Sequence, residues 1–596
     1  MTLNPLKRIA KASYLNHIFL YFAFLFLLCI AYFSIGKIGF YLDDFSSILY
    51  NPIIKPPIDW VSLWQANGLR ALIYSVIAIE YSWFGDQAQG YHYIGVLIHI
   101  GVSILLLLVL SRLAVLSKLN ESQRLAFVFF ALLLFVLHPQ NSQAVVYIIQ
   151  QTATLAAFFS LLTLYLYINA RQSLCRFRQY IWLLFAFFSF ILAMVTKQNS
   201  IIVPVVILLI EWLFFGRWLK GGLSFLFVSF VSLLIVFIIV TDLNIYEILV
   251  RLDQLTRENS EITRLDYFRT QLNVIGHYLL QFFLPVNLRL EYDNLLIINW
   301  DVRTILWGIL HCSLLLISIF LRKKCPLFAF GILGYYCFHI VESSFLPIRD
   351  LTFEHRTYLP NTMLVIAISS LLIYLFNYVK GYFSIKWLSK TLISFCITAI
   401  LLLTYLTHQR VNVWADKLTF YQNEVKFTKK NPRPYARLGG LYVDQGNCGL
   451  AIGYFEHAMA LYRKAHNSNI GVQPELLQNY ITCLRKFGLN DKAEAIEKFL
   501  LLKVKEPKRR AAILSQQASR FMEKKQHLEA LPLLREAFKL DNKNYAVLVN
   551  LAICEAVSNN IPRAEELLKF ALVLKPNDEL VLNLQQQLTN LKRRNE

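Results

Sequence analysis

The sequence predicts an all-α protein: a polytopic helical bundle in a membrane, followed by a solenoid of helical repeats. Two observations support this prediction. More than half of the 596 residues are hydrophobic, and they gather in uninterrupted blocks such as 17–35 and 225–240. Blocks of this length match a helix that crosses a bilayer about 30 Å thick. From about residue 408 the composition changes to mixed charge with helical periodicity.

The apolar blocks give eleven candidate membrane spans. They cover residues 17–35, 92–114, 124–138, 143–169, 179–196, 199–216, 222–241, 304–321, 326–344, 361–379 and 391–407. Basic residues cluster ahead of the first span and in every second connection after it, as the positive-inside rule expects of cytoplasmic loops. The N-terminus is therefore predicted to be cytoplasmic and the region after the last span extracytoplasmic. The same distribution explains the formal charge of +21 without nucleic-acid binding.

The apolar segment 272–288 is a candidate for a twelfth span. Counting it would move the basic group at 322–324 to the outer side, against the charge rule. We therefore predict a re-entrant or interfacial helix there. The membrane domain is then 1–407, with a first outer loop at 36–91 and a long outer loop at 242–303.

The second domain, 408–596, carries a 34-residue helical repeat. Ala530 and Ala537 are followed 34 residues later by Ala564 and Ala571. An earlier unit fits the tetratricopeptide pattern through Tyr435, Leu438, Gly439, Tyr442, Ala451, Phe455 and Ala458. Stacked repeats of this kind bury one continuous core and present a concave face. That groove is predicted to hold a protein or peptide segment, with a scaffold for assembly as the alternative.

The nine cysteines are scattered, with no C-x-x-C and no metal-ligand spacing. This distribution predicts neither a disulfide framework nor a zinc site. The sequence also has no Walker loop, G-x-G-x-x-G, H-E-x-x-H or nucleophile elbow, so soluble nucleotide chemistry is not indicated.

Two adjacent carboxylates, Asp43 and Asp44, stand just after the first span on the predicted outer face. A general base needs one carboxylate near a hydroxyl proton, and a neighbouring acid can hold a cation or tune its pKa. The pair is therefore predicted to be catalytic, with capping of the following helix as the alternative. The pattern establishes no cofactor; a divalent cation, if one is used, would be held by these two acids.

Glu354, His355 and Arg356 emerge on the same predicted face. Arg356 can hold a phosphate through two parallel hydrogen bonds, His355 can donate a third, and Glu354 can orient the arginine. Lys197, at the mouth of another span, adds a second cation, with snorkelling as the alternative. Cations at the depth of lipid headgroups predict a site for a lipid-linked phosphate.

The stretch 138–151, HPQNSQAVVYIIQQ, is polar for the entrance of a span, and its proline breaks the preceding helix. Gln143 and Gln151 are well placed for sugar hydroxyls, although hydrogen bonds between helices explain these amides nearly as well. His138 is either a site residue or an interfacial histidine.

The order of these motifs resembles that of a known family. The first helix is followed by Asp43-Asp44, then by LHPQNSQAVVYIIQQ, TKQNS and FEHRTYLPN, and finally by tetratricopeptide repeats. This order is similar to that of the transmembrane and tetratricopeptide repeat-containing (TMTC-like) proteins and their bacterial relatives. These belong with the lipid-phosphate-sugar-dependent glycosyltransferases of the GT-C fold. The resemblance covers nearly the whole chain.

The resemblance implies a polyprenyl-phosphate-linked sugar as donor and a protein hydroxyl, delivered by the repeats, as acceptor. It assigns the role of base to Asp43 or Asp44, with a preference for Asp43. It assigns the donor phosphate to Arg356, His355 and Lys197.

Two positions depart from the relatives. Arg70-Ala71 stands where the first outer loop usually carries R-P, and Gln150-Gln151 stands where the bacterial relatives carry Q-R. The second change removes one candidate cation. Arg70 is a further candidate for orienting the donor or contacting the sugar.

The predicted activity is therefore inverting transfer of a sugar to Ser or Thr hydroxyls of a protein, on the periplasmic face of a bacterial inner membrane. Two alternatives stay open. One is transfer or polymerisation of a whole oligosaccharide on a lipid carrier, and the other is a non-enzymatic repeat scaffold for envelope assembly.

Overall fold

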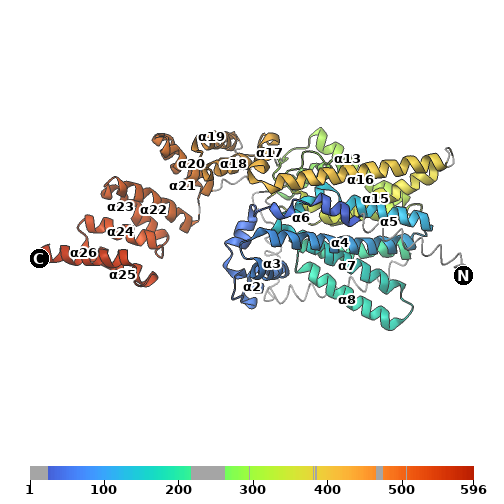
Figure 1. Cartoon of the computed structure of the whole chain (residues 1–596), viewed down its shortest axis with the longest axis horizontal. Coiled ribbons are helices and arrows are strands. Elements are labelled where there is room, and N and C mark those ends of the chain that lie inside the picture. Colours follow the sequence, from blue (N-terminus) through green and yellow to red (C-terminus); the bar gives the residue numbers. More distant parts are fainter. Residues whose placement is uncertain are drawn as a thin grey trace, which may run out of the picture. The chain divides into compact units, whose positions relative to one another are not determined.

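The computed structural model describes residues 24–216, 262–293, 296–348, 350–379, 382, 385–464, 474–504 and 506–595, and within these ranges every regular element is a helix (Figure 1). The predicted all-α fold is confirmed. Contacts divide the chain into two compact units: a bundle unit that ends at Pro434 and a repeat unit that begins at Tyr435. The predicted boundary at 407/408 falls inside one helix of the bundle unit, Ile385–Ala415.

The described part of the bundle unit consists of helices of 5 to 31 residues and short helical turns. Its helices are α2 (Trp60–Asn67), α3 (Ala71–Phe84), α4 (Ala88–Leu116), α5 (Glu121–Val136), α6 (Ser142–Val146), α7 (Gln151–Gln172), α8 (Arg176–Met194), α9 (Val203–Ile210), α12 (Arg264–Phe283), α13 (Val302–Leu321), α14 (Pro326–His339), α15 (Tyr358–Val379), α16 (Ile385–Ala415) and α17 (Lys417–Phe427). The short turns are η1 (Ile35–Lys37), η2 (Phe45–Leu49), η3 (Pro52–Ile54), η4 (Gly68–Arg70), η5 (Pro139–Asn141), η6 (Ile148–Gln150), η7 (Gln198–Ile202), η8 (Glu211–Phe215) and η9 (Glu354–Thr357).

Among the described residues, seven helices are long and apolar enough to cross a membrane, or up to eight if one bent pair is a single span. The seven are Ala88–Leu116, Ile148–Gln172, Arg176–Met194, Gln198–Phe215, Val302–Leu321, Glu354–Val379 and Trp387–Ala415. The predicted span 222–241 lies outside the described residues, and only the second half of the predicted span 17–35 is described. The segment 272–288, predicted not to cross, falls largely in α12, which is not one of the seven.

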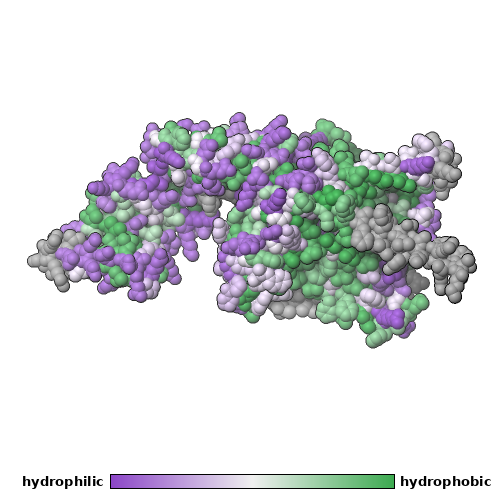
Figure 2. All heavy atoms as spheres, viewed as in Figure 1, coloured by the Kyte–Doolittle hydropathy of each residue, from purple (hydrophilic) through white to green (hydrophobic). Residues whose placement is uncertain are grey.

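The apolar helices divide into a central one and peripheral ones. In the most apolar stretch of Ile148–Gln172, 72% of the residues are buried, whereas only 17% are buried in Val302–Leu321 and in Trp387–Ala415. The side chains that α13 and α16 leave exposed are large and hydrophobic, including Leu306, Phe320, Phe395 and Leu401. Figure 2 shows apolar surface over much of this unit. Such surface is costly in water and suits contact with lipid, as a membrane protein requires.

A break after α5 shapes the part of the bundle that concerns function. α5 begins with a capping box between Asn120 and Gln123 and ends one residue before His138-Pro139. Proline has no N–H to continue the ladder, so the chain turns, and Pro139–Val146 runs at 50° to α5. The turn leads α6 and η6 through the interior, where every residue from Leu137 to Ile148 is buried.

The repeat unit consists of antiparallel helix pairs. Its helices are α18 (Arg433–Asp444), α19 (Cys448–Lys464), α20 (Pro474–Lys486), α21 (Asn490–Lys503), α22 (Pro507–Glu523), α23 (His527–Leu540), α24 (Tyr545–Val557), α25 (Ile561–Leu574) and α26 (Glu579–Asn595). The four alanines of the predicted repeat, Ala530, Ala537, Ala564 and Ala571, are completely buried. Their small side chains let paired helices approach closely, which confirms the predicted repeats.

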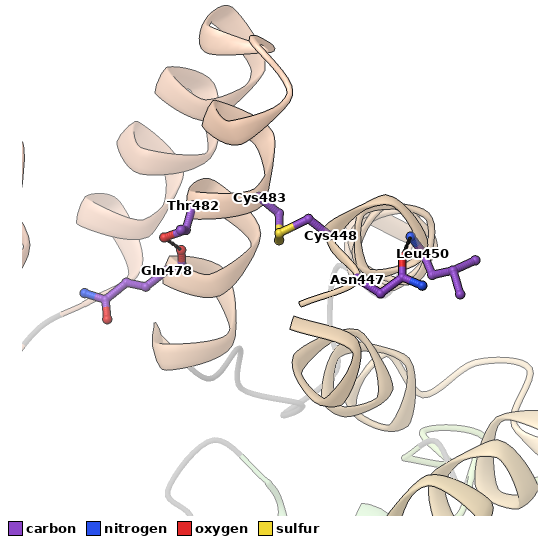
Figure 3. The surroundings of a disulfide bond; sticks show 6 residues. All are labelled: Asn447, Cys448, Leu450, Gln478, Thr482 and Cys483. Carbon is purple, nitrogen blue, oxygen red and sulfur yellow. Dashed lines mark hydrogen bonds between the residues drawn. A yellow bond between two sulfur atoms is a disulfide. The ribbon is translucent and has the colours of Figure 1, made fainter. Parts of the chain in front are cut away.

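One sequence prediction about this unit was wrong. Cys448, at the start of α19, forms a disulfide with Cys483 in α20, and their Cα atoms are 5.2 Å apart (Figure 3). The two cysteines are 35 residues apart, about one repeat length. Stacked repeats bring such positions together in space, so the absence of short spacings such as C-x-x-C was the wrong criterion.

Candidate functional site

The acidic pair lies in a tight turn between η1 and η2, and its two members are held differently. The Asp44 carboxylate is almost completely buried and accepts N–H bonds from Tyr41 and from Ile149, both at 2.9 Å. It makes no capping bond to η2, contrary to the alternative considered from the sequence. Burial raises the pKa of Asp44 to about 8, although these two N–H bonds work in the opposite direction. Asp44 therefore fastens the turn to η6.

Asp43 is presented to solvent by the same turn. Its side chain is exposed, while its backbone N–H donates to the Tyr147 hydroxyl at 2.9 Å. α16 holds the turn from another side, because the Tyr41 hydroxyl donates to the carbonyl of Trp414 in that helix at 2.5 Å. Asp43 thus has a fixed backbone and an accessible carboxylate, which are the requirements for a general base.

The Glu354–Thr357 turn, η9, is fixed by the buried segment after α5. The His355 N–H donates to the Gln143 side-chain oxygen at 2.7 Å. Arg356, which is 6% exposed, donates to the carbonyls of Asp350 at 2.7 Å and Leu351 at 3.4 Å. The Gln143 amide nitrogen is buried and has no hydrogen-bond partner among the described residues, so it can still donate to a ligand.

The structure corrects the predicted role of Glu354. Its carboxylate accepts the Arg289 N–H at 2.6 Å and the Tyr292 hydroxyl, and it lies 3.7 Å from Arg410. It makes no contact with the Arg356 guanidinium, because residues two apart in a 3₁₀ turn point in different directions. Glu354 therefore ties η9 to the segment after α12, which contains Arg289 and Tyr292, and to α16.

Cations from three separate regions converge beside η9. The charges of Lys197, Arg356 and Arg70 all act on the His355 ring. Arg70 reaches this point because the Leu72 N–H, at the start of α3, donates to the Val195 carbonyl at 3.1 Å, two residues before Lys197. We call Arg70, Lys197 and Arg356 the cation cluster, and the His355 ring lies beside it.

Lys197 brings a buried ammonium group to the cluster. Its Nζ is 2.7 Å from the Glu342 carboxylate, and the two side chains are only 9% and 13% exposed. Burial lowers the pKa of Lys197, Glu342 counteracts this, and Arg356 and Arg70 add repulsion. An anion brought near Lys197 would relieve this repulsion.

The two parts of the site are attached to one short segment, residues 143–149. Gln143 bonds to His355 at one end, while Tyr147 and Ile149 bond to Asp43 and Asp44 at the other. Six residues in this mostly helical conformation span roughly 10 Å. Hydrogen bonds to this one segment therefore attach both the acidic pair and η9 to the same part of the bundle.

Of two predicted sugar contacts, His138 has a structural role instead, and Gln151 has a structural bond through its amide nitrogen while its buried side-chain oxygen has no hydrogen-bond partner among the described residues. The Gln151 amide donates to the Tyr91 carbonyl at 3.0 Å, which joins α7 to α4. His138 is completely buried, its Nε2 bonds to the Phe282 carbonyl at 2.8 Å and its Nδ1 to the Gln140 N–H at 3.2 Å. No ring nitrogen of His138 is left for a sugar, so it is not retained as a site residue.

Sequence reasoning missed Glu342 and Tyr147. Glu342 was included in a predicted apolar span, 326–344, where an acidic residue should have been recognised as a candidate functional group. Tyr147 lies in the polar stretch 138–151, but nothing in the sequence shows that its hydroxyl meets Asp43. Among the described residues no group of three or more His, Cys, Asp or Glu side chains could hold a metal ion.

Comparisons with known proteins bear on both units. Residues 521–588 match the tetratricopeptide repeat family. Over 436 residues the chain is 24% identical to a protein O-mannosyl-transferase of Caenorhabditis elegans, an alignment that covers 68% of this chain. The chain spans 57% of the length of that curated relative.

Two solved structures of other proteins show weak similarity. One is YrrB, described as a TPR protein with an unusual peptide-binding site: 19% identity over 28% of this chain and 81% of that chain, with a TM-score of 0.23. The other is the APC/C hetero-tetramer Cut9–Hcn1: 15% identity over 89% of this chain and 92% of that chain, with a TM-score of 0.24. Scores this low carry no structural argument.

Proposed function

We propose that this chain is an integral-membrane glycosyltransferase of the GT-C type. It moves a sugar from a polyprenyl-phosphate donor to Ser or Thr hydroxyls of a protein. The observation that carries the proposal is the segment 143–149, which joins an accessible carboxylate, Asp43, to the cation cluster. The similarity to a protein O-mannosyl-transferase supports the same class of reaction.

In the proposed mechanism the acceptor hydroxyl lies against Asp43. The Asp43 carboxylate takes the hydroxyl proton while the oxygen attacks the anomeric carbon of the sugar. The bond between that carbon and the phosphate oxygen breaks, and the lipid phosphate leaves with the bonding electron pair. Attack opposite the leaving group inverts the anomeric configuration.

The cation cluster has its role at the leaving group. Lys197, Arg356 and Arg70 hold the negative charge that develops on the lipid phosphate, in a site whose buried groups are already in position. The Gln143 amide and the His355 ring are the neutral donors for remaining phosphate or sugar oxygens.

The roles of the two acids follow from their surroundings. Asp44 is buried and both of its oxygens accept backbone N–H groups, so it positions the turn. Asp43 is exposed and is the proposed base. The bond from its N–H to Tyr147 keeps the carboxylate over the same segment that holds His355.

The repeats are proposed to bind the acceptor protein in the periplasm of a bacterium, with the bundle in the inner membrane. The Cys448–Cys483 disulfide supports this side of the membrane, because disulfides persist in oxidising compartments and are rare in the cytosol. The positive-inside distribution of basic residues supports the same orientation.

Intact-mass analysis of envelope proteins tests the proposal. A strain that lacks this chain, and the same strain complemented with the wild-type chain or with Asp43→Asn, are compared. We expect one or more proteins to lose the mass of a single sugar in the deletion strain and to regain it only with the wild-type chain. Loss of a multi-sugar mass would instead favour oligosaccharide transfer, and unchanged masses would contradict a glycosyltransferase.

A further inference from the structure

Glu342 is a buried acid that the proposed reaction does not use. It follows α14 by three residues, and its carboxylate contacts Lys197 at 2.7 Å and the Asn199 amide at 3.5 Å. The charge of Arg356 also acts on it. The Tyr267 hydroxyl, from α12, donates to the Glu342 carbonyl at 2.7 Å and fixes its backbone. Glu342 is therefore held in place as part of the anion-binding region.

A carboxylate and a phosphate bind lysine and arginine through the same kind of contact, an anionic oxygen that accepts N–H bonds. Glu342 therefore acts as an internal anion among the cations that are proposed to hold the donor. Any phosphate that binds there must share Lys197 with Glu342 or lie next to it, and a like charge at close range is unfavourable in a buried site.

The balance of buried charges sets how much negative charge the site can accept. Lys197 and Arg356 are buried and contribute two positive charges, and Glu342, whose side chain is 13% exposed, contributes one negative charge, so these three groups carry a net charge of +1. Arg70 is exposed and is screened by solvent ions. A sugar linked to a lipid through one phosphate carries one negative charge at neutral pH, whereas a pyrophosphate linkage carries two.

We propose that Glu342 is a specificity-determining residue that restricts the donor to lipids linked through a single phosphate. It balances the buried cations for one negative charge and repels the second phosphate of a pyrophosphate-linked donor. This inference rests on the proposed donor site at Lys197 and Arg356.

Binding of two short lipid probes to the full chain in detergent tests the inference. The methyl esters of farnesyl phosphate and of farnesyl diphosphate share the same lipid and carry one and two negative charges, as the two kinds of donor linkage do. The wild-type chain is expected to bind the monophosphate more tightly than the diphosphate. In Glu342→Gln this preference should be weaker. In Glu342→Gln the affinity for the diphosphate should rise about tenfold more than the affinity for the monophosphate, because one like charge is removed.

Three further variants separate selectivity from folding. Glu342→Asp keeps the charge and should keep the wild-type preference. Lys197→Gln combined with Glu342→Gln restores a buried net charge of +1, so both affinities should fall while their ratio stays near the wild-type value. Glu211→Gln changes another buried acid, the partner of Arg171, and should leave the ratio unchanged.

The outcomes distinguish a wrong donor site from a wrong role for Glu342. If the wild-type chain binds neither probe, the proposed donor site is wrong. If it binds the probes but Glu342→Gln has the wild-type ratio, the role of Glu342 is wrong. If Glu342→Gln does not fold, Lys197→Gln is compared with the double variant: a ratio that shifts toward the diphosphate when Glu342→Gln is added to Lys197→Gln supports the inference, and an equal ratio in the two variants contradicts it.

Discussion

The span Gln198–Phe215 has a buried ion pair at each end, and the two pairs differ in how fully their charges are satisfied. At the η8 end, Glu211 accepts two bonds from Arg171, at 2.6 and 3.2 Å, and a third from the Tyr167 hydroxyl at 2.9 Å. Ahead of η7, Lys197 contacts Glu342 once, at 2.7 Å, and Arg356 and Arg70 add their charges to its surroundings. The Arg171–Glu211 pair carries no net charge, and both oxygens of the Glu211 carboxylate accept hydrogen bonds. The second has an excess of cations.

This difference distinguishes charges that are satisfied within the bundle from charges that can still bind a ligand. A buried ion pair whose partners satisfy each other contributes to folding and leaves nothing for a ligand. Buried cations in excess destabilise the empty site and are compensated when an anion binds. The same contrast separates Asp44, whose oxygens are occupied by backbone N–H groups, from the exposed Asp43.

The largest effect is expected at the acidic pair. Asp43→Asn removes the proposed base and should lower kcat for sugar transfer about 1,000-fold, within the usual range for a general base. Its unfolding temperature in detergent should match that of the wild-type chain, because the exposed carboxylate has no buried charge to compensate. Transfer by Asp43→Asn at the wild-type rate would remove it from the mechanism.

The next largest effect is expected at Arg356. Arg356→Ala should lower kcat/KM for the lipid-phosphate donor about 100-fold, since a buried charge at the leaving group is lost. Arg356→Lys keeps the positive charge but lacks the two parallel N–H donors of the guanidinium group, and it should retain part of the activity. Measurements with the purified chain and a radiolabelled donor give both values. Equal rates for the alanine variant and the wild type would place the donor phosphate elsewhere.

Arg171→Ala is the matched change at the other end of the span. It leaves the fully buried Glu211 carboxylate without its charged partner, which should reduce the free energy of unfolding by about 3–5 kcal/mol. Thermal unfolding in detergent measures this loss. The KM for the donor should be unchanged in the folded fraction, and a raised KM would show that this pair also belongs to the site.

The last effect is a pH dependence that comes from Asp44. Its pKa is raised to about 8 in the folded chain, against about 4 in an unfolded one. Between these values the folded chain binds more protons than the unfolded chain, so this group makes stability fall as the pH rises from about 4 to about 8. Asp44→Asn should flatten the decline in unfolding temperature between pH 5 and pH 8. An equal slope in the variant would contradict the buried, protonated state of Asp44.

The fold could be predicted because its signals are local in the sequence. Apolar blocks indicate helices that avoid water, and alanines 34 residues apart indicate buried contacts between paired helices. The structure confirms both the all-α fold and the C-terminal repeats. The side chains of the cation cluster come from three regions of the chain. Their convergence was predicted only through the topology, since alternate connections share one face.

The contacts within the site could not be predicted, because they depend on turns that have no sequence signature. The direction of Glu354, toward Arg289 and Arg410, follows from the 3₁₀ turn of η9. The partner of Lys197, Glu342, lies 145 residues away along the chain, and nothing in the sequence pairs them. The disulfide between Cys448 and Cys483 likewise requires knowledge of how two repeats stack.

The most direct test of the central claim is a structure of Asp43→Asn bound to a polyprenyl-phosphate sugar. We expect phosphate oxygens at hydrogen-bond distance, about 3 Å, from Lys197 or Arg356, with the anomeric carbon between the phosphate and residue 43. A donor phosphate bound away from these residues, or at the opposite end of the bundle beside Arg171, would contradict it.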